Sequence, residues 1–177
     1  MNYPELLKPA LAHRIELPSR GMVEVPKTTP IFRKWTGEMP SDTFNRKPVL
    51  EFDGEMVFAE LAILRIFQKA GWKGRWIDSY RHRYLTSYWP IVTSDLPREE
   101  TISDWQAIRA TANCKSGCFD VFCWRDDTFL FIEAKRKAHD KTRATQHRWL
   151  QAALDRGLSL ESFLIAEWDY VPAGYTQ

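Results

Sequence analysis

The stretch that decides the fold is "CFDVFCWRDDTFLFIEAK", residues 118–135. Its two apolar runs are separated by "RDDT", a pattern typical of a β-hairpin with buried strands. If Asp126 and Asp127 form a two-residue loop, Asp120 lies directly opposite Glu133, with both side chains on one face. A four-residue loop centred on the same point preserves this pairing, and a three-residue loop breaks it.

Three ionisable side chains meet at the end of this hairpin. Lys135 follows Glu133 by two residues, so it points to the same face of the strand, while Ala134 points away. Two carboxylates as close as Asp120 and Glu133 repel each other, and a divalent cation relieves the repulsion. The ammonium can stabilise charge on a phosphate oxygen or hold an attacking water. The structural alternative is a salt bridge between Lys135 and the acids. An isolated pattern of Asp followed by Glu-x-Lys is common by chance, so the pattern alone favours this alternative.

The segments around the hairpin predict an α/β fold. In chain order the expected elements are a helix over 58–71, a strand over 75–80, strands over 118–124 and 128–135, a helix over 142–157 and a strand over 162–168. The two helices show apolar residues at helical spacing and end at Gly71 and Gly157. This order indicates a mixed β-sheet flanked by helices.

Two polar residues head the apolar faces of these helices. Gln146 lies three positions before Trp149 and four before Leu150, so its amide is on the side that faces the sheet. A buried amide needs partners, which the carboxylate cluster can supply. Glu60 stands in the same relation to apolar residues of the first helix. The alternative for Glu60 is a partly exposed acid near a helix N-terminus.

Asp120 followed by "EAK" at 133–135, in this order of elements, resembles the PD-(D/E)XK nuclease superfamily. The stretches "GCFDVF", "EAKRK" and "TQHRWLQAALDRG" are similar to its VRR-NUC (virus-type replication-repair nuclease) branch, which carries a glutamine where this chain has Gln146. The resemblance covers about residues 55–168. One departure is Phe119, which stands where the superfamily name has a proline that its pattern does not require.

The resemblance implies a restriction-endonuclease-like core that binds Mg²⁺ or Mn²⁺ and hydrolyses phosphodiester bonds. From the resemblance together with the pattern of residues, we expect these roles: Asp120 and Glu133 as metal ligands, Lys135 as the residue that orients or activates water, Gln146 as a supporting residue and Glu60 as a residue that completes the site. The resemblance adds the backbone carbonyl of Ala134 as a further ligand.

Positive charge is concentrated after the hairpin. Residues 134–148 hold six basic residues and one acidic residue, a net +5, in a chain whose net charge is +2. A local basic patch indicates an anionic partner, and the alternative is a solvated helix face. We expect Arg136, Lys137, Lys141 and Arg143 to bind nucleic acid.

An insertion at about 81–112 follows the first predicted strand and ends in a predicted helix over 97–112. Around its start, basic residues alternate with aromatic residues, namely Trp76, Tyr80, Tyr84, Tyr88 and Trp89. We expect Arg75, Arg81 and Arg83 to contact phosphates, with His82 among them, and the aromatic rings to stack on bases. The alternative places half of these aromatic residues in the core.

The N-terminal segment differs in composition from the rest. Seven of the ten prolines fall within residues 1–48, which disfavours helices and central strands there. We expect residues 1–54 to form an extended arm packed on the core, with one hairpin over 21–35. Residues 55–177 then form the nuclease-like domain.

The cysteines Cys114, Cys118 and Cys123 indicate reduced thiols. An odd number without a secretory signal argues against a disulfide framework. A zinc site with His139 or His147 is disfavoured because the spacing contains no CxxC pair. Cys123 is expected to pack as a small hydrophobic residue.

Length and hydropathy limit the class of protein. A chain of 177 residues suits one α/β domain, and no apolar run is long enough to cross a membrane. We expect a cytoplasmic Mg²⁺-dependent nuclease without a membrane partner. Its expected substrate is DNA rather than RNA, and branched or structured DNA is included. Alternatives are a non-catalytic nucleic-acid-binding module that retains the fold and a structural or inhibitory partner protein. The sequence leaves a homodimer open.

Overall fold

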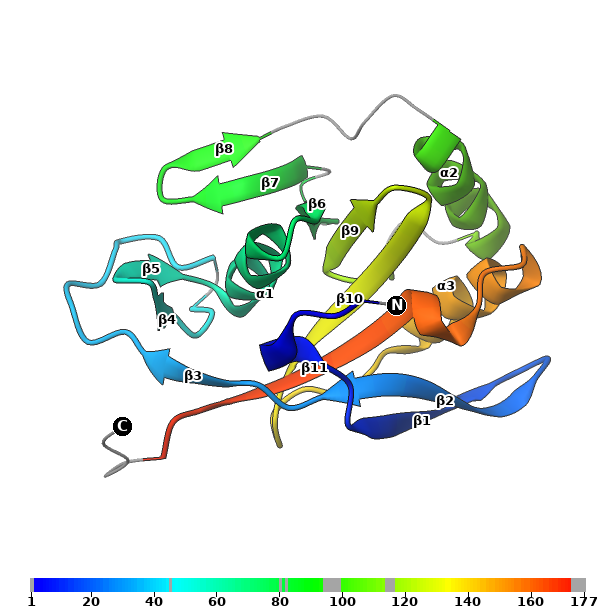
Figure 1. Ribbon diagram of the computed structural model, residues 1–177, viewed down its shortest axis with the longest axis horizontal. Coiled ribbons are helices and arrows are strands. Elements are labelled where there is room, and N and C mark those ends of the chain that lie inside the picture. The colour runs from blue at the N-terminus through cyan, green and yellow to red at the C-terminus, as the bar shows by residue number, and fades with distance from the viewer. Residues whose placement is uncertain are drawn as a thin grey trace.

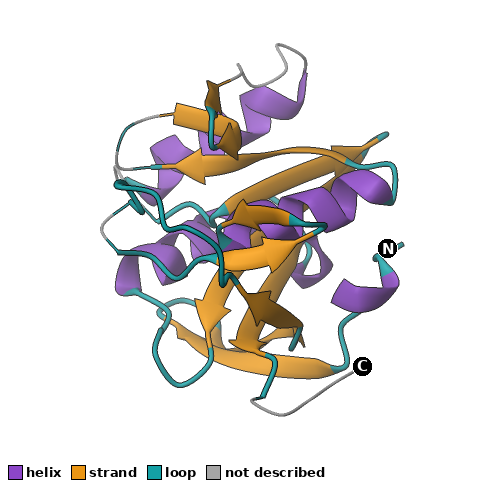
Figure 2. Cartoon of the chain, turned by 90° about the vertical axis from the view of Figure 1, so that its left-hand side faces the viewer, coloured by secondary structure: helices purple, strands orange, loops and turns teal. Residues whose placement is uncertain are grey.

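The computed structural model describes residues 2–44, 46–79, 81, 83–93, 100–113 and 117–172. In this part of the chain the strands form one curled mixed sheet, and helices lie on both of its faces (Figures 1 and 2). The helices are α1 (Ala59–Lys69), α2 (Glu100–Ala112) and α3 (Ala144–Asp155), with the 3₁₀ turns η1 (Glu5–Leu7) and η2 (Leu160–Ser162). None of the described helices has the length and apolar character that a membrane crossing needs.

The strands in chain order are β1 (Leu11–Leu17), β2 (Gly21–Thr28), β3 (Ile31–Lys34), β4 (Leu50–Phe52), β5 (Glu55–Val57), β6 (Lys73–Asp78), β7 (Arg83–Tyr88), β8 (Ile91–Thr93), β9 (Val121–Arg125), β10 (Thr128–Arg136) and β11 (Phe163–Tyr170). Their order across the sheet is β5-β4-β3-β11-β10-β9-β6-β7-β8, and β2 pairs with β1 and β11. The pairs of β11 with β10, β2 and β3 are parallel, and the other pairs are antiparallel.

The elements expected on both sides of the hairpin are confirmed as α1, β6, β9, β10, α3 and β11. The helix expected over 97–112 is α2, and the antiparallel pair β7–β8 precedes it. Three residues named in the sequence analysis, Tyr80, His82 and Cys114, and residues 97–99 of the expected helix lie outside the described residues.

The central hairpin has the predicted two-residue loop. Arg125 pairs with Thr128, and Asp126 adopts a left-handed conformation with φ of +51°, which aspartate tolerates better than most residues. The paired register ends at Val121 with Ile132, one position before Asp120 and Glu133. Asp120 bends toward β6 instead, since its carbonyl accepts a 2.7 Å hydrogen bond from the N–H of Ile77. The two acids are therefore neighbours at the end of the ladder and not a pair within it.

Residues 1–54 contribute more to the sheet than the sequence predicts. The hairpin expected over 21–35 is wrong, because the hairpin joins β1 and β2. The expectation that this segment avoids the central sheet is also wrong, since β2 and β3 pair with β11 and β4 extends the sheet beyond β3. Pro30 falls between strands, and Pro26 precedes the two residues of β2 that pair with β11, so neither interrupts that pairing. The division of the chain at residue 54 stays a prediction.

Side chains of the sheet alternate between two apolar layers. Ile132 of β10 belongs to the layer that contains α1, while Phe131 belongs to the layer that contains Trp149 of α3. Glu133 and Lys135 continue the alternation of Phe131, so both point to the α3 face at the end of β10. The fold thus ends an apolar strand with two charged side chains beside the first turn of a helix.

Candidate active site

A cleft of about 360 Å³ lies where the ends of β6 and β10 meet the first turns of α1 and α3. The charged side chains in its lining are Glu60, Asp78, Asp120, Glu133 and Asp140, with Lys47, Lys135 and Arg143. Five acids face three basic residues in this lining, and Asp78 is also paired with Arg83 and Arg81 from outside it. The repulsion between acids is therefore concentrated at Asp120 and Glu133, where a cation would reduce it.

Glu133 and Lys135 form an ion pair in this cleft, with 2.6 Å between Oε1 and Nζ. Both are buried, Glu133 to 2% and Lys135 to 8% relative exposure. Burial raises the pKa of Glu133, and Lys135 opposes this shift. Oε2 of Glu133 is buried without a hydrogen-bond partner among the described residues. The salt bridge that the sequence left as the structural alternative is present, and it leaves one carboxylate oxygen unsatisfied.

Asp120 lies beside Glu133 although it precedes β9 by one residue. Its Oδ2 accepts a hydrogen bond of 3.1 Å from the backbone N–H of Ala134. Burial raises the pKa of Asp120 well above its ordinary value, and the carboxylates of Glu133 and Glu60 raise it further. Crowding of acids therefore disfavours the charged form of Asp120.

Gln146 is buried in the first turn of α3 and lines the cleft. Its Oε1 accepts a hydrogen bond of 2.8 Å from the backbone N–H of Arg143, so one end of the amide caps the helix. The amide also lowers the pKa of Glu133, an effect smaller than that of burial. The structure places Gln146 as the sequence predicts, and adds a capping role that the sequence did not indicate.

Glu60 is not the partly exposed acid of the alternative interpretation, because its relative exposure is 7%. It lies in the first turn of α1, and its Oε1 forms an ion pair with the ammonium of Lys47. The sequence analysis missed Lys47. The segment "PSDTFNRKP" that contains it has no periodicity that would place a side chain.

The predicted nucleic-acid-binding residues after β10 lie near the cleft. Arg143 is exposed and lines it, and Lys137 and Lys141 are exposed in the connection to α3. The guanidinium of Arg136 lies 5.0 Å from the ring centroid of Tyr170 and makes a cation–π contact with it, so this arginine is partly engaged within the protein.

The arginines expected to bind phosphates around the start of the insertion lie in two places. Arg83 forms an ion pair with the buried Asp78, with 3.0 Å between Nη2 and Oδ2, and Nη1 of Arg81 is 3.8 Å from the same oxygen. Arg75 lies over the ring of Trp124 at 5.5 Å, outside the lining of the cleft. Asp78 was missed by sequence reasoning, although an acid at the end of an apolar strand is the signal that singled out Glu133.

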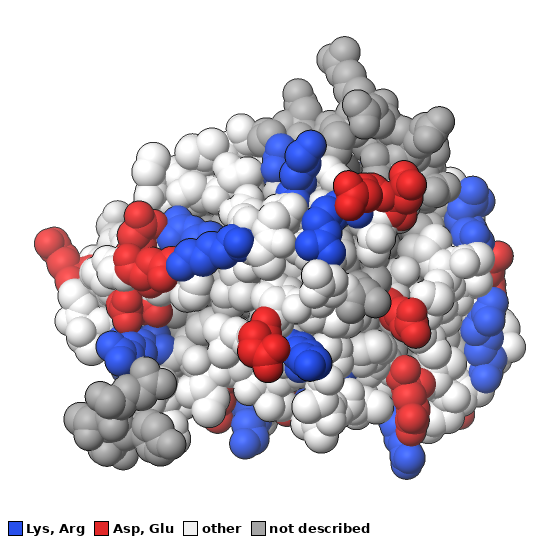
Figure 3. All heavy atoms as spheres, in the orientation of Figure 1, with Lys and Arg blue, Asp and Glu red and all other residues white. Residues whose placement is uncertain are grey.

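Some of the aromatic residues expected around the insertion belong to the core, as the alternative interpretation states. Trp76 and Tyr88 are buried, at 2% and 3% relative exposure, and Tyr84 and Trp89 are partly exposed. On the face of the molecule in Figure 3, basic and acidic side chains are interspersed, so that face presents no extended basic surface.

Neither of the described cysteines, Cys118 and Cys123, forms a disulfide. Cys123 is buried in the layer next to α1, and burial raises the pKa of its thiol. This confirms that it packs as a small hydrophobic residue. Cys118 is partly exposed.

The residues of the cleft fit the magnesium ion that the resemblance implies. No group of three or more His, Cys, Asp or Glu side chains within the described residues is arranged to hold a metal. Magnesium needs only one or two carboxylates, with water and other oxygen atoms as its remaining ligands. Asp120 and Glu133 supply two acids, and the buried oxygen of Glu133 lacks a partner. Ala134, whose carbonyl the resemblance implies as a further ligand, is in the same lining.

Comparisons with known proteins give no relative for this chain: no family model, no curated protein and no solved structure matches it. Its function must therefore be argued from the cleft.

Proposed function

We propose that this chain is a Mg²⁺- or Mn²⁺-dependent nuclease with a restriction-endonuclease-like core and a site of the PD-(D/E)XK, VRR-NUC-like type. The observation that supports this most is the unsatisfied oxygen of Glu133, buried next to Asp120 and Lys135 in a cleft where neighbouring carboxylates disfavour the charged form of Asp120. A salt bridge alone gives no reason for a second acid whose charge is disfavoured there.

The reaction is hydrolysis of a phosphodiester, in which a water oxygen bonds to phosphorus and the bond from phosphorus to the leaving oxygen breaks. The products are a phosphate monoester and a hydroxyl group. Asp120, Glu133 and the carbonyl of Ala134 would hold the metal, which when bound supplies positive charge to the phosphate and makes water more acidic. Lys135 donates hydrogen bonds to a phosphate oxygen or to the attacking water, and stabilises the negative charge that develops. Gln146 keeps the first turn of α3 against Glu133.

The substrate in this proposal is DNA, branched or structured forms included, and the exposed Lys137, Lys141 and Arg143 bind its phosphates. We place the activity in the cytoplasm. Cleavage of both strands of a duplex in one binding event would use two copies of the site, which a homodimer provides.

The test is incubation of the purified chain with single-stranded, duplex and branched DNA and with the same forms of RNA. Each substrate is incubated with Mg²⁺, with Mn²⁺ and with EDTA, beside Glu133→Gln as the inactive control. Metal-dependent cleavage by the unmodified chain, absent in Glu133→Gln, supports the proposal. Binding of these substrates without cleavage would instead assign a non-catalytic binding module. Cleavage of equal rate by Glu133→Gln would remove the proposed site from the reaction.

A further inference from the structure

Lys47 is a second lysine in the cleft, and it belongs to the N-terminal segment, outside the region that resembles a nuclease. It lies in the connection between β3 and β4 and lines the cleft with Lys135. Its ammonium forms an ion pair with Glu60 and lies 5.5 and 5.3 Å from the ring centroids of Phe44 and Trp76. A carboxylate and two aromatic rings therefore hold one ammonium at a defined place.

The backbone around Lys47 is held as well. Its N–H donates to the carbonyl of Thr43 at 2.9 Å. Phe44 adopts a left-handed conformation, with φ of +52°, and its N–H donates to Oδ1 of Asp42 at 2.8 Å. Oδ2 of Asp42 accepts a hydrogen bond of 2.7 Å from the hydroxyl of Tyr88 in β7. A strained aromatic residue persists only where its surroundings impose the conformation, so Asp42, Phe44 and Lys47 are fixed onto the sheet.

The ion pair with Lys47 bears on whether Glu60 is a metal ligand. Its carboxylate is engaged by Lys47, and the described residues contain no group of three acids arranged around a metal. The pKa of Lys47 is raised: burial lowers it, but the carboxylates of Glu60, Asp120 and Glu133 raise it by more. The ammonium thus remains charged and faces the two acids assigned to the metal.

We propose that Lys47 contacts a phosphate oxygen of the substrate from the α1 side of the cleft, and that Glu60 is a positioning residue for Lys47 and not a metal ligand. The inference rests on the nuclease function proposed above. Lys135 reaches the cleft from β10, so the two lysines come from different elements. A phosphodiester has two non-bridging oxygens, and ammonium groups from two directions can stabilise both as charge develops.

The first test is Lys47→Met, which keeps the apolar stem against Phe44 and Trp76 and removes the charge. We expect kcat/KM to fall by about 10²-fold, the cost typical of one charge-stabilising donor. The increase in Tm on addition of Mg²⁺ should not become smaller, because no metal ligand is removed and one positive charge near Asp120 and Glu133 is lost. Lys47→Arg retains the charge and should recover most of the loss.

A matched control is Lys69→Met. Lys69 also combines a carboxylate, Asp53 at 2.5 Å, with an aromatic ring, Phe52 at 5.0 Å, but it lies at the opposite end of α1 from the cleft. We expect Lys69→Met to leave cleavage unchanged. An equal loss in Lys47→Met and Lys69→Met would show a general effect of removing such lysines and would overturn the proposal.

The second test asks how Glu60 acts, through a double-mutant cycle. If Glu60 works through Lys47, Glu60→Gln lowers cleavage by itself but causes no further loss in the Lys47→Met background. Most of the Mg²⁺-dependent increase in Tm should remain in both backgrounds, because Glu60→Gln removes a neighbouring charge and no metal ligand. Loss of the Mg²⁺ effect in both backgrounds to the extent expected for Glu133→Gln would make Glu60 a metal ligand and overturn its assignment. The double variant contains no unpaired charge at this pair, so it tests the proposal even if Lys47→Met does not fold.

The outcomes separate this inference from the proposed function. If the unmodified chain cleaves nucleic acid and Lys47→Met cleaves equally well, the inference on Lys47 fails and the nuclease stands. If the unmodified chain binds nucleic acid without cleaving it, the nuclease fails, and Lys47→Met must still weaken binding for the phosphate contact to stand. If it neither binds nor cleaves, both proposals fail.

Discussion

Nζ of Lys135 lies 2.6 Å from Oε1 of Glu133, and Oε2 of the same carboxylate is buried without a partner among the described residues. An ion pair built only for stability would be expected to satisfy the second oxygen as well, because an unsatisfied buried acceptor costs about 1–3 kcal/mol. Glu133 is therefore either a partner in a structural salt bridge or a metal ligand, and the two interpretations predict different responses to added metal.

Magnesium should raise the Tm of the unmodified chain and have a much smaller effect on Glu133→Gln. A ligand that binds only the folded state stabilises it by about 2.7 kcal/mol at 100 times its Kd. Glu133→Gln keeps the shape of the side chain but removes one ligand charge. Thermal scans with increasing MgCl₂ check this, with KCl of equal ionic strength as the control. The same Mg²⁺ response in both proteins would favour the salt bridge as the whole explanation.

Lys135→Met should separate metal binding from cleavage. Both carboxylates remain, so the increase in Tm with Mg²⁺ is kept. Cleavage should fall by about 10²–10³-fold, the cost typical of removing one charge-stabilising donor. Parallel measurement of kcat and of the Mg²⁺ titration checks this. If Lys135→Met instead loses stability and keeps its rate, the lysine is a structural partner of Glu133.

Asp120→Asn should stabilise the chain in EDTA. The pKa of Asp120 is raised in the folded state, first by burial and then by Glu133 and Glu60. A raised folded-state pKa favours folding while the group is protonated, and this contribution is lost as pH rises through that pKa. Above it the charged carboxylate costs stability, which asparagine avoids, while its amide oxygen can take the place of Oδ2 and accept from the N–H of Ala134.

The measurement is Tm of both proteins in EDTA from pH 5 to 9. The advantage of Asp120→Asn should increase with pH and disappear when saturating Mg²⁺ stabilises the unmodified chain. A Tm lower than that of the unmodified chain at every pH would contradict the crowding of acids at this site.

Local chemistry made the centre of this fold predictable from sequence. The turn residues "RDDT" set the hairpin register, and the alternation of side chains then fixed which face Glu133 and Lys135 share. The helices followed from apolar periodicity and glycine caps. Gln146 was placed correctly because its position relative to Trp149 depends on the helix alone.

The parts that escaped prediction depend on contacts distant in sequence. β2 and β3 pair with β11, more than a hundred residues away, and nothing in a proline-rich segment specifies a parallel partner. Lys47 reaches Glu60 from an irregular connection that has no period to read. The bend that takes Asp120 out of the ladder arises from its hydrogen bond to Ile77 on a neighbouring strand. Local patterns cannot encode such partners.

Reversing the charge of Arg136 and Lys137 to Glu should weaken binding to all nucleic acids alike. Phosphate contacts are independent of sequence, and log K falls linearly with log salt by about 0.9 per phosphate contact on duplex DNA. The double variant should therefore bind less tightly and with a shallower salt dependence. Binding titrations between 50 and 200 mM KCl, conditions of the order used for such slopes, check this.

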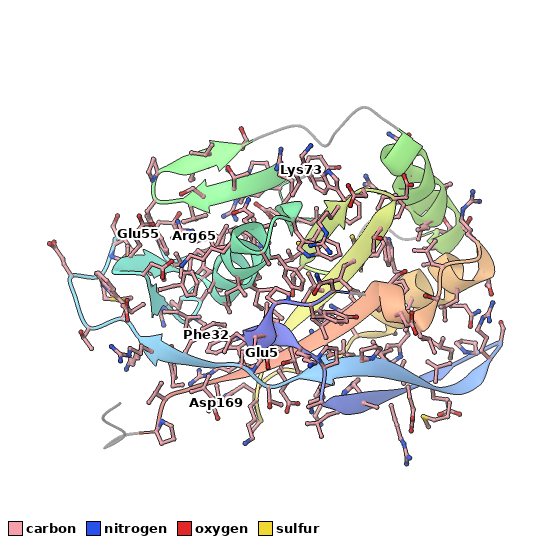
Figure 4. The ribbon with its side chains drawn as sticks, viewed as in Figure 1. Glu5, Phe32, Glu55, Arg65, Lys73 and Asp169 are labelled. Atoms are coloured by element: carbon pink, nitrogen blue, oxygen red, sulfur yellow. The ribbon has the colours of Figure 1, made fainter. Side chains whose placement is uncertain are left out.

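The matched control reverses Lys8 and Lys73, two exposed lysines outside the lining of the cleft (Lys73 begins β6 and is labelled in Figure 4). Lys69 and Arg65 of α1 are left intact, because Lys69 forms an ion pair with Asp53 and Arg65 forms one with Glu55 of β5, 2.6 Å from Nη1 to Oε2 (Arg65 and Glu55 are labelled in Figure 4). Equal weakening by the control would show that only net charge matters and would remove the basic patch from the interface.

Gly117→Ala should lower both stability and cleavage, because this glycine touches the first turn of α3. Its φ is +112°, and a Cβ atom there would lie 2.5 Å from the carbonyl oxygen of Thr145, the residue before Gln146. The backbone conformation alone costs about 1–3 kcal/mol for a residue with a side chain. Relief of the clash must displace backbone that positions Gln146 against Glu133.

Gly157→Ala is the control, since Gly157 also has a positive φ, of +92°, but an added Cβ meets nothing within 4 Å. We expect both variants to lose Tm, and Gly117→Ala alone to lose kcat beyond what its unfolded fraction explains. The measurement is the rate per folded molecule well below each Tm, and equal rates for the two variants would mean that the position of the α3 N-terminus does not limit the reaction.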